Sequence, residues 1–232
     1  RQEELKIDSV MDETDMITAA DMDEAGCLYL AVSRMDDKRD ITGKIVKVTP
    51  DDTVQILADH IEENVKNIRL IADGYIIGCS DGMLQCFSME GHMKYEIENS
   101  DYTDICVAGD KLVVLTVRDI ETYDISDGHV LETITSFDDA MTEGLEDAAS
   151  EKGKDALSCS NIMKYDEKSD QIYIMLGTGL FAYKLSDKLG IRLTTFKSAD
   201  IRYDFVVEDS DTFVAVTGDK SGNKRIVVYS SS

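Results

Sequence analysis

The sequence predicts an all-β fold, a β-propeller of about five four-stranded antiparallel blades. Three observations predict it. A strand that ends in an acidic or glycine-containing turn recurs along the 232 residues. The strand before each such segment is strongly apolar, and the strand after it is polar and alternating. Repetition of one four-stranded antiparallel unit is typical of a propeller.

The recurring turn follows the third strand of each unit. It ends the segments 45–52, 84–91, 121–128, 181–188 and 225–230. Successive turns lie roughly 39, 37, 60 and 44 residues apart, whereas propeller blades recur at about 40–50. The long interval contains residues 136–157, which are acidic and rich in alanine. We predict that this segment is an insertion between two blades.

The strands on either side of this third strand differ in character. The second strand is the most apolar, in segments 28–32, 75–79, 112–115, 172–176 and 213–216. Near-continuous β-branched and aromatic residues are typical of a strand covered on both faces. The fourth strand is more polar and alternates, in segments 53–57, 93–97, 130–134 and 191–195. That pattern is typical of an outer edge strand.

These units predict one propeller domain over residues 1–232. The predicted blades span residues 15–57, 58–98, 99–135, 158–196 and 197–232. The fifth unit lacks an outer strand, and the strand-like segment 5–10 could supply it and close a five-blade ring. The alternative is a fragment of a larger propeller, because the chain stops directly after a strand-like segment. Both arrangements stay open.

The composition limits the classes of partner. There are 47 acidic and 24 basic residues, which gives a formal net charge of -23. Such a surface repels phosphate groups, so we predict no nucleic-acid partner, whereas a cationic partner or Ca²⁺ is favoured. No apolar segment approaches the ~20 residues of a membrane-spanning helix, so we predict none in this chain. The five cysteines lack Cys-x-x-Cys spacing and are interpreted as small buried residues.

The turns carry a resemblance to known proteins. Asp-Gly or Glu-Gly follows an aromatic-polar strand, as in the Tyr-Asp-Ile-Ser-Asp-Gly of residues 123–128. This resembles bacterial extracytoplasmic propellers of the PQQ-like, lactonase-like and surface-lipoprotein type, which also occur attached to solute-binding lipoproteins of Gram-positive anaerobes. The resemblance covers residues 17–232 and is architectural. It implies a location outside the cytoplasm, at the cell surface, and transfers no active-site residue.

Residues that could carry chemistry are dispersed. His92 and His129 each follow a glycine in equivalent turns, and His60 is expected in a loop between blades. Three separated histidines do not indicate a zinc site or a Ser-His-Asp triad. The acidic clusters do not have the spacing of a calcium-binding loop. We therefore predict no cofactor, with Ca²⁺ as the ion left open.

The long loops suggest where a ligand would bind. Loops that join second to third strands, and loops that join units, share one face of a propeller, and long loops on a rigid scaffold commonly bind ligands. The predicted ligand-binding residues belong to this face. They are Arg34, Asp36, Asp37, Arg39, His60, Tyr102, Lys197, Arg202 and Tyr203.

Three hypotheses for function follow. The first is a non-catalytic binding module of a secreted or surface-anchored bacterial protein, with a protein or small-molecule ligand, favoured because no catalytic constellation is present. The second is a metal-dependent, lactonase-like hydrolase or lyase, with the metal held by side chains of inner strands. Its candidate ligands are Asp21, Asn67, Asp104 and Asn161. The third is a cytosolic scaffold, favoured by the free cysteines alone.

Overall fold

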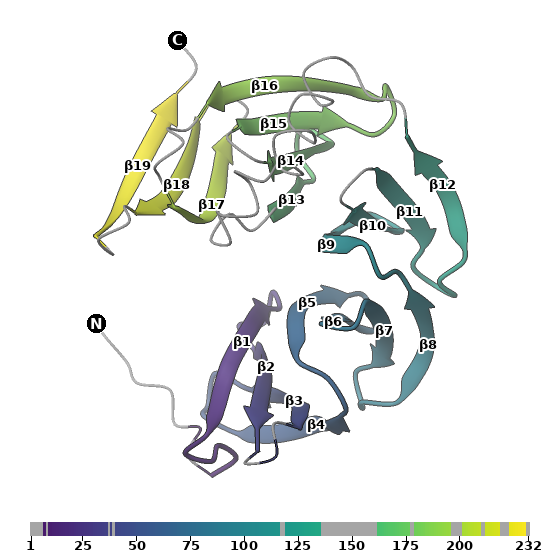
Figure 1. Ribbon diagram of the computed structural model, residues 1–232, viewed down its shortest axis with the longest axis vertical. Helices are drawn as coiled ribbons and strands as arrows, with labels where there is room; N and C mark the ends of the chain where they lie inside the picture. The colour runs from purple at the N-terminus through teal and green to yellow at the C-terminus, as the bar shows by residue number, and fades with distance from the viewer. Residues whose placement is uncertain are drawn as a thin grey trace. The chain divides into compact units, whose positions relative to one another are not determined.

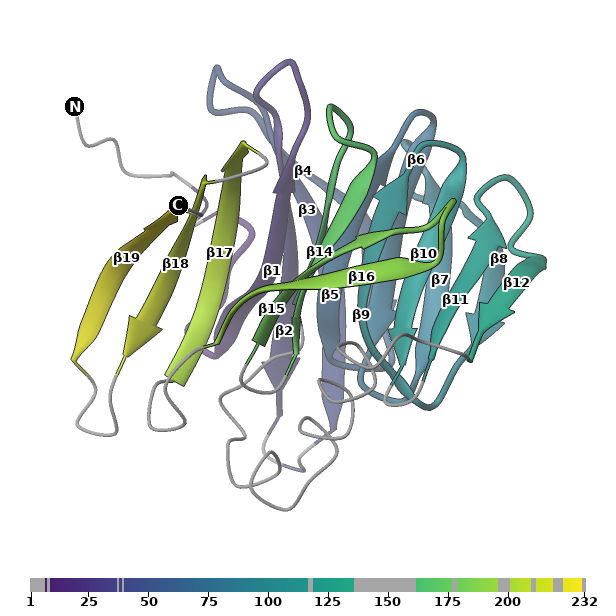
Figure 2. The ribbon, with the colours of Figure 1, turned by 90° about the horizontal axis from the view of Figure 1, so that it is seen from above.

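The computed structural model describes residues 7, 9–36, 38, 40–116, 119–135, 162–176, 179–195, 201–209, 212–218 and 223–230. Within these ranges the chain forms antiparallel β-sheets and no helix (Figures 1 and 2). Four sheets have four strands each and the fifth has three. In every sheet the strands are hydrogen-bonded in chain order. The predicted fold class, an all-β propeller of five blades, is confirmed.

The first two blades lie in one compact unit, formed by residues 1–101 and 126–128. The strands of the first blade are β1 (Asp15–Met22), β2 (Leu28–Met35), β3 (Ile41–Val48) and β4 (Val54–Ile61). Those of the second blade are β5 (Val65–Ile71), β6 (Gly74–Cys79), β7 (Met83–Ser88) and β8 (Met93–Glu98).

The other three blades lie in a second compact unit, formed by residues 102–125 and 129–232. The strands of the third blade are β9 (Tyr102–Ala108), β10 (Lys111–Thr116), β11 (Ile120–Asp124) and β12 (Val130–Ile134). The fourth blade has β13 (Ile162–Asp166), β14 (Gln171–Leu176), β15 (Gly179–Lys184) and β16 (Leu189–Thr195). The fifth has β17 (Ile201–Asp209), β18 (Thr212–Gly218) and β19 (Lys224–Ser230).

Two predictions about the chain's organisation fall largely outside the described residues. The proposed insertion, residues 136–157, lies entirely outside them. Of the segment 5–10, suggested as an outer strand for the fifth blade, only Ile7, Ser9 and Val10 are described. Ile7 and Val10 pack against a buried cluster of β2 and β3 in the first blade.

The second strands of the first four blades are largely buried on both faces. In β18 of the fifth blade, partly buried and buried residues alternate from Thr212 to Thr217. Along β2, Tyr29 and Ala31 join a cluster shared with the second blade, whereas Leu30 and Val32 join the cluster under the N-terminal segment. This alternation follows from the two-residue period of a strand. All six residues of β6 are buried, as expected for a strand covered on both sides.

The second unit repeats this packing scheme. In β14, Ile172 and Ile174 face a cluster shared with the third blade, and Tyr173 and Met175 face one shared with the fifth. The described cysteines fit the same cores, because Cys27, Cys79, Cys86 and Cys106 are all buried. The fifth cysteine, Cys159, lies outside the described residues.

Two aspartates tie the first strands of neighbouring blades together. Oδ2 of Asp21 accepts a hydrogen bond from the Leu70 backbone N–H at 2.9 Å. In the second unit, Oδ2 of Asp104 accepts one from the Met163 N–H at 2.7 Å, and its Oδ1 accepts one from Ile105 at 2.8 Å. Asp104 is only 3% exposed. Charge-assisted hydrogen bonds of this kind are the stronger ones in proteins.

We expect Asp104→Asn to lower the free energy of unfolding by about 2 kcal/mol, because one of two buried N–H groups would face an amide NH₂ instead of an acceptor. Urea denaturation followed by circular dichroism measures this change. The matched control is Asp101→Asn, an exposed aspartate in the loop before β9. Equal midpoints for Asp104→Asn and the wild type would contradict the assigned role.

Candidate ligand-binding site on the loop face of the first blade

The loop face is defined here as the end of the first two blades that carries the β2–β3, β4–β5 and β6–β7 loops. In the first blade β2 and β4 end at this face, whereas β1 and β3 begin there. Strand pairing places Asp15 directly opposite Arg34, and Arg34 opposite Thr42. Polar residues at the ends of three strands therefore meet on one side of the blade.

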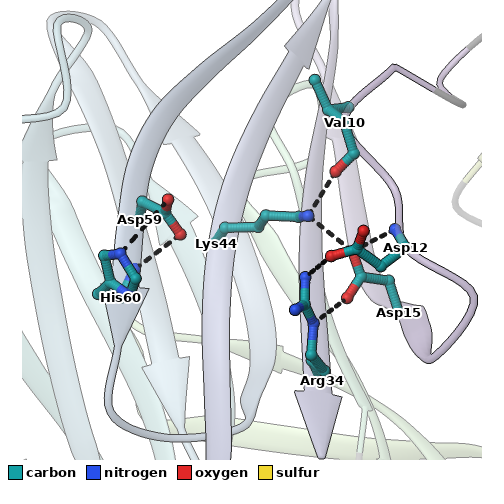
Figure 3. A network of polar contacts seen from close by, with 7 residues as sticks. All are labelled: Val10, Asp12, Asp15, Arg34, Lys44, Asp59 and His60. Carbon is teal, nitrogen blue, oxygen red and sulfur yellow. Dashed lines mark hydrogen bonds and ion pairs between the residues drawn. The ribbon is translucent and has the colours of Figure 1, made fainter.

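An ion network centred on Asp15 occupies this position (Figure 3). The Asp15 side chain is only 1% exposed. Its two oxygens contact Arg34 Nε at 2.8 Å and Lys44 Nζ at 2.6 Å. Lys44 also donates to the Val10 carbonyl, and Arg34 also pairs with Asp12. The network thus joins three strands to the segment that precedes β1.

Asp15 is held in its charged form by these partners. Burial alone would raise its pKa, but the hydrogen bonds from Arg34 and Lys44 outweigh that effect and lower the pKa to about 2. A buried carboxylate is tolerated when it is paired and hydrogen-bonded. The network is therefore rigid, and its charges are largely paired with one another.

A cleft of about 390 Å³ opens beside the network. Its lining combines charged, polar and apolar side chains with backbone. The lining residues are Ser9, Val10, Met11, Asp12, Asp15, Val32, Arg34, Thr42, Gly43, Lys44, Ile56, Asp59 and His60. In a small-molecule site, polar groups held in fixed positions orient the ligand.

Exposed polar groups of the cleft include residues of β4 and β2. The His60 side chain is 89% exposed, and its Nε2 lies 3.8 Å from Asp59 Oδ2. Asp59 Oδ1 accepts the His60 backbone N–H at 2.9 Å. The Arg34 side chain is 39% exposed. The cleft thus offers an imidazole, a guanidinium edge and a carboxylate to a ligand.

The structure brings together two of the residues predicted from sequence, Arg34 and His60. His60 lies within β4 at its loop-face end, not in the expected loop, and has a positive φ of 55°. The Asp36 side chain has a structural role, because its Oδ1 accepts hydrogen bonds from the backbone N–H groups of Lys38 and Asp40 at 2.8 and 2.9 Å. That arrangement shapes the β2–β3 loop.

The remaining predicted binding residues lie in the second unit or outside the described residues. Tyr102 is buried at the start of β9 in the second unit. Arg202 and Tyr203 belong to β17. Asp37, Arg39 and Lys197 lie outside the described residues.

The sequence analysis missed Asp15 and Lys44. Lys44 lies 29 residues from Asp15 in the chain, so no local motif marks the pair. A usable signal was the cross-strand pairing of Asp15 with Arg34, since opposite charges on facing strands stabilise a sheet. This pairing can be recognised from the sequence only if the bounds of β1 are known. β1 has no continuous apolar pattern that would mark those bounds.

The candidate metal ligands of the alternative hypothesis have the following positions. Asp21 and Asp104 accept backbone N–H groups of the next blade, as described above. Asn67 lies in β5, and Asn161 is outside the described residues. Within the described ranges, no three His, Cys, Asp or Glu side chains are grouped as metal ligands.

The comparisons with known proteins support the architecture. No protein-family model matches the chain, and no curated protein matches its sequence. The extracellular domain of a one-component system from B. thetaiotaomicron is similar with a TM-score of 0.55 and 12% identity, over 92% of this chain and 33% of that one. The computationally designed Ika8 protein is similar with a TM-score of 0.51 and 12% identity, over 93% of this chain and 71% of that one.

A further similar structure is HIRA(644-1017), with a TM-score of 0.44 and 9% identity, over 78% of this chain. The chain spans about half of that protein's length, 55%. At such identities the likeness concerns the fold. The described residues contain no helix long and apolar enough to cross a membrane.

We expect Asp15→Asn to lower the free energy of unfolding at pH 7 by about 3 kcal/mol, because Lys44 and Arg34 would lose a buried counter-ion. The stabilisation that Asp15 contributes to the folded wild type is fully present above 3.8, the pKa of an unperturbed aspartate. It is lost as the pH falls through about 2, the pKa of Asp15 in the folded chain. The wild type should therefore lose more stability between pH 4 and pH 2 than the variant does.

Urea titrations at pH 7, 4 and 2 measure this difference. Asp12→Asn is the control, because the Asp12 side chain is 63% exposed and should change stability by about 0–1 kcal/mol. Parallel pH profiles for the wild type and Asp15→Asn would contradict the assignment.

Proposed function

We propose that the chain is a non-catalytic binding module that engages a protein or small-molecule ligand through the loop face of its first two blades. The observation that carries the proposal is the cleft beside Asp15, Arg34 and Lys44, in which a paired ion network fixes the ends of three strands. Rigid support of this kind reduces the ordering cost of binding.

The proposal includes a location outside the cytoplasm, as part of a secreted or surface-anchored bacterial protein. The similar extracellular domain from B. thetaiotaomicron supports it. The resemblance of the turns to extracytoplasmic propellers points the same way. The acidic composition, with a net charge of -23, favours ligands that carry positive charge.

We expect a thermal-shift screen with amino acids, organic amines, sugars and short peptides to yield a ligand whose affinity falls about five-fold in His60→Asn, through the loss of one hydrogen bond. Asparagine tolerates the positive φ of this position. Titration calorimetry with the wild type and the variant measures the change.

The matched control is His92→Asn, an exposed histidine in the β7–β8 turn at the opposite end of the second blade. An equal loss of affinity in both variants would contradict a site on the loop face. Turnover of a compound in the screen, abolished by His60→Asn, would contradict a non-catalytic role.

A further inference from the structure

A second concave surface, called here the interblade groove, lies between β4 of the first blade and β7–β8 of the second. Its volume is about 580 Å³. It shares Asp59 and His60 with the cleft described above. The lining residues are Leu57, Ala58, Asp59, His60, Ile61, Glu62, Glu63, Cys79, Asp81, Met83, Gln85, Phe87, Gly91 and Met93.

The floor of the groove is apolar. Leu57, Ile61 and Phe87 line it, each less than 10% exposed. Met93 also lines the groove but is 56% exposed. Exposed methionines beside an apolar cleft are common at adaptable binding surfaces.

Gly91 brings the two blades into contact at the end of the groove away from the loop face. A Cβ atom there would lie 1.8 Å from the Leu57 carbonyl oxygen, and the φ of Gly91 is +82°. Only glycine allows the turn backbone to approach β4 this closely. The groove is therefore bounded by backbone at this end.

The rim at the loop-face end is acidic. It carries Asp59, Glu62, Glu63 and Asp81, and the lining contains no lysine or arginine. Glu63 accepts a hydrogen bond from Ser80 at 2.6 Å, and Asp81 accepts one from the Met83 N–H at 2.9 Å. In the described part of the chain, none of these carboxylates forms an ion pair with lysine or arginine.

The acidic rim also affects the pKa of Cys79, whose side chain lines the groove. Burial raises the pKa of Cys79 to about 12, and the charges of Asp81 and Glu63 add to the rise against the opposing effect of Lys66. A groove with an apolar floor and several carboxylates along one end is complementary to an apolar group with a positive charge beside it.

The backbone of β4 indicates that the ligand is a peptide. β4 is the last strand of its sheet, so it is paired with β3 on one side only. Five consecutive residues of β4, 57–61, line the groove. An extended peptide can bind along such a strand edge through main-chain hydrogen bonds.

We propose that the interblade groove binds an extended peptide segment of a protein partner in which lysine or arginine stands next to large apolar residues. The inference rests on the proposed binding function and adds the chemistry of the partner. The apolar side chains would cover Phe87, Ile61 and Met93, and the cationic groups would reach the carboxylates of the rim.

The test uses a fluorescent, end-blocked hexapeptide of alternating lysine and leucine, with anisotropy as the readout. The expected result is saturable binding by the wild-type chain that weakens about five-fold in Glu62→Gln/Asp81→Asn, through the loss of two charge contacts. The matched control, Glu24→Gln/Glu96→Gln, removes the same charge at exposed positions outside the groove. It should bind as the wild type does.

A second pair of variants tests the apolar floor. Met93→Ser should weaken binding about five-fold, because a leucine side chain loses its apolar contact. Met22→Ser is the control, since Met22 is 60% exposed and lies outside the groove. Both methionines are exposed, so neither substitution threatens the fold.

Several outcomes would overturn the inference. Equal weakening in the two charge variants would show general attraction to an acidic surface, and equal binding of a lysine–serine hexapeptide would exclude an apolar contribution. Absence of saturable binding would also overturn it. A ligand that responds to His60→Asn but not to Met93→Ser would overturn the groove inference and leave the proposed binding function standing.

Discussion

Burial of the second strand on both faces in the first four blades is the constraint on which the rest of the structure depends. A four-stranded sheet of this size cannot bury such a strand alone, so stability requires a neighbour on each side. In the first blade one face of β2 packs against the second blade and the other against the N-terminal segment.

The candidate site follows from that rigidity. Asp15, Arg34 and Lys44 come from three strands whose register is set by the cores beneath them, so the buried carboxylate meets both cations without a dedicated loop. The same packing leaves the edge of β4 beside β7, which creates the apolar groove. The cleft and the interblade groove are both lined by Asp59 and His60.

The sequence predicted the parts of the fold that depend on local pattern, including β12, whose bounds match the predicted segment 130–134. Two of the residues predicted to bind a ligand, Arg34 and His60, line the same cleft. It could not predict the Asp15 network, because β1 is only partly buried and its partners lie far along the chain. Asp21 and Asp104 were predicted as candidate metal ligands, whereas each accepts a hydrogen bond from a backbone N–H group of the next blade. Sequence spacing alone does not reveal these hydrogen bonds.

The central claim is that the loop face of the first two blades is a binding surface. Amide hydrogen exchange of the chain with and without a saturating ligand tests it most directly, because it locates the contact without substitutions. The account predicts slowed exchange in β4 and in the residues around the β6–β7 loop, 57–63 and 79–83. Slowed exchange confined to the turns at the opposite end of these blades, 23–27, 49–53 and 72–73, would contradict it.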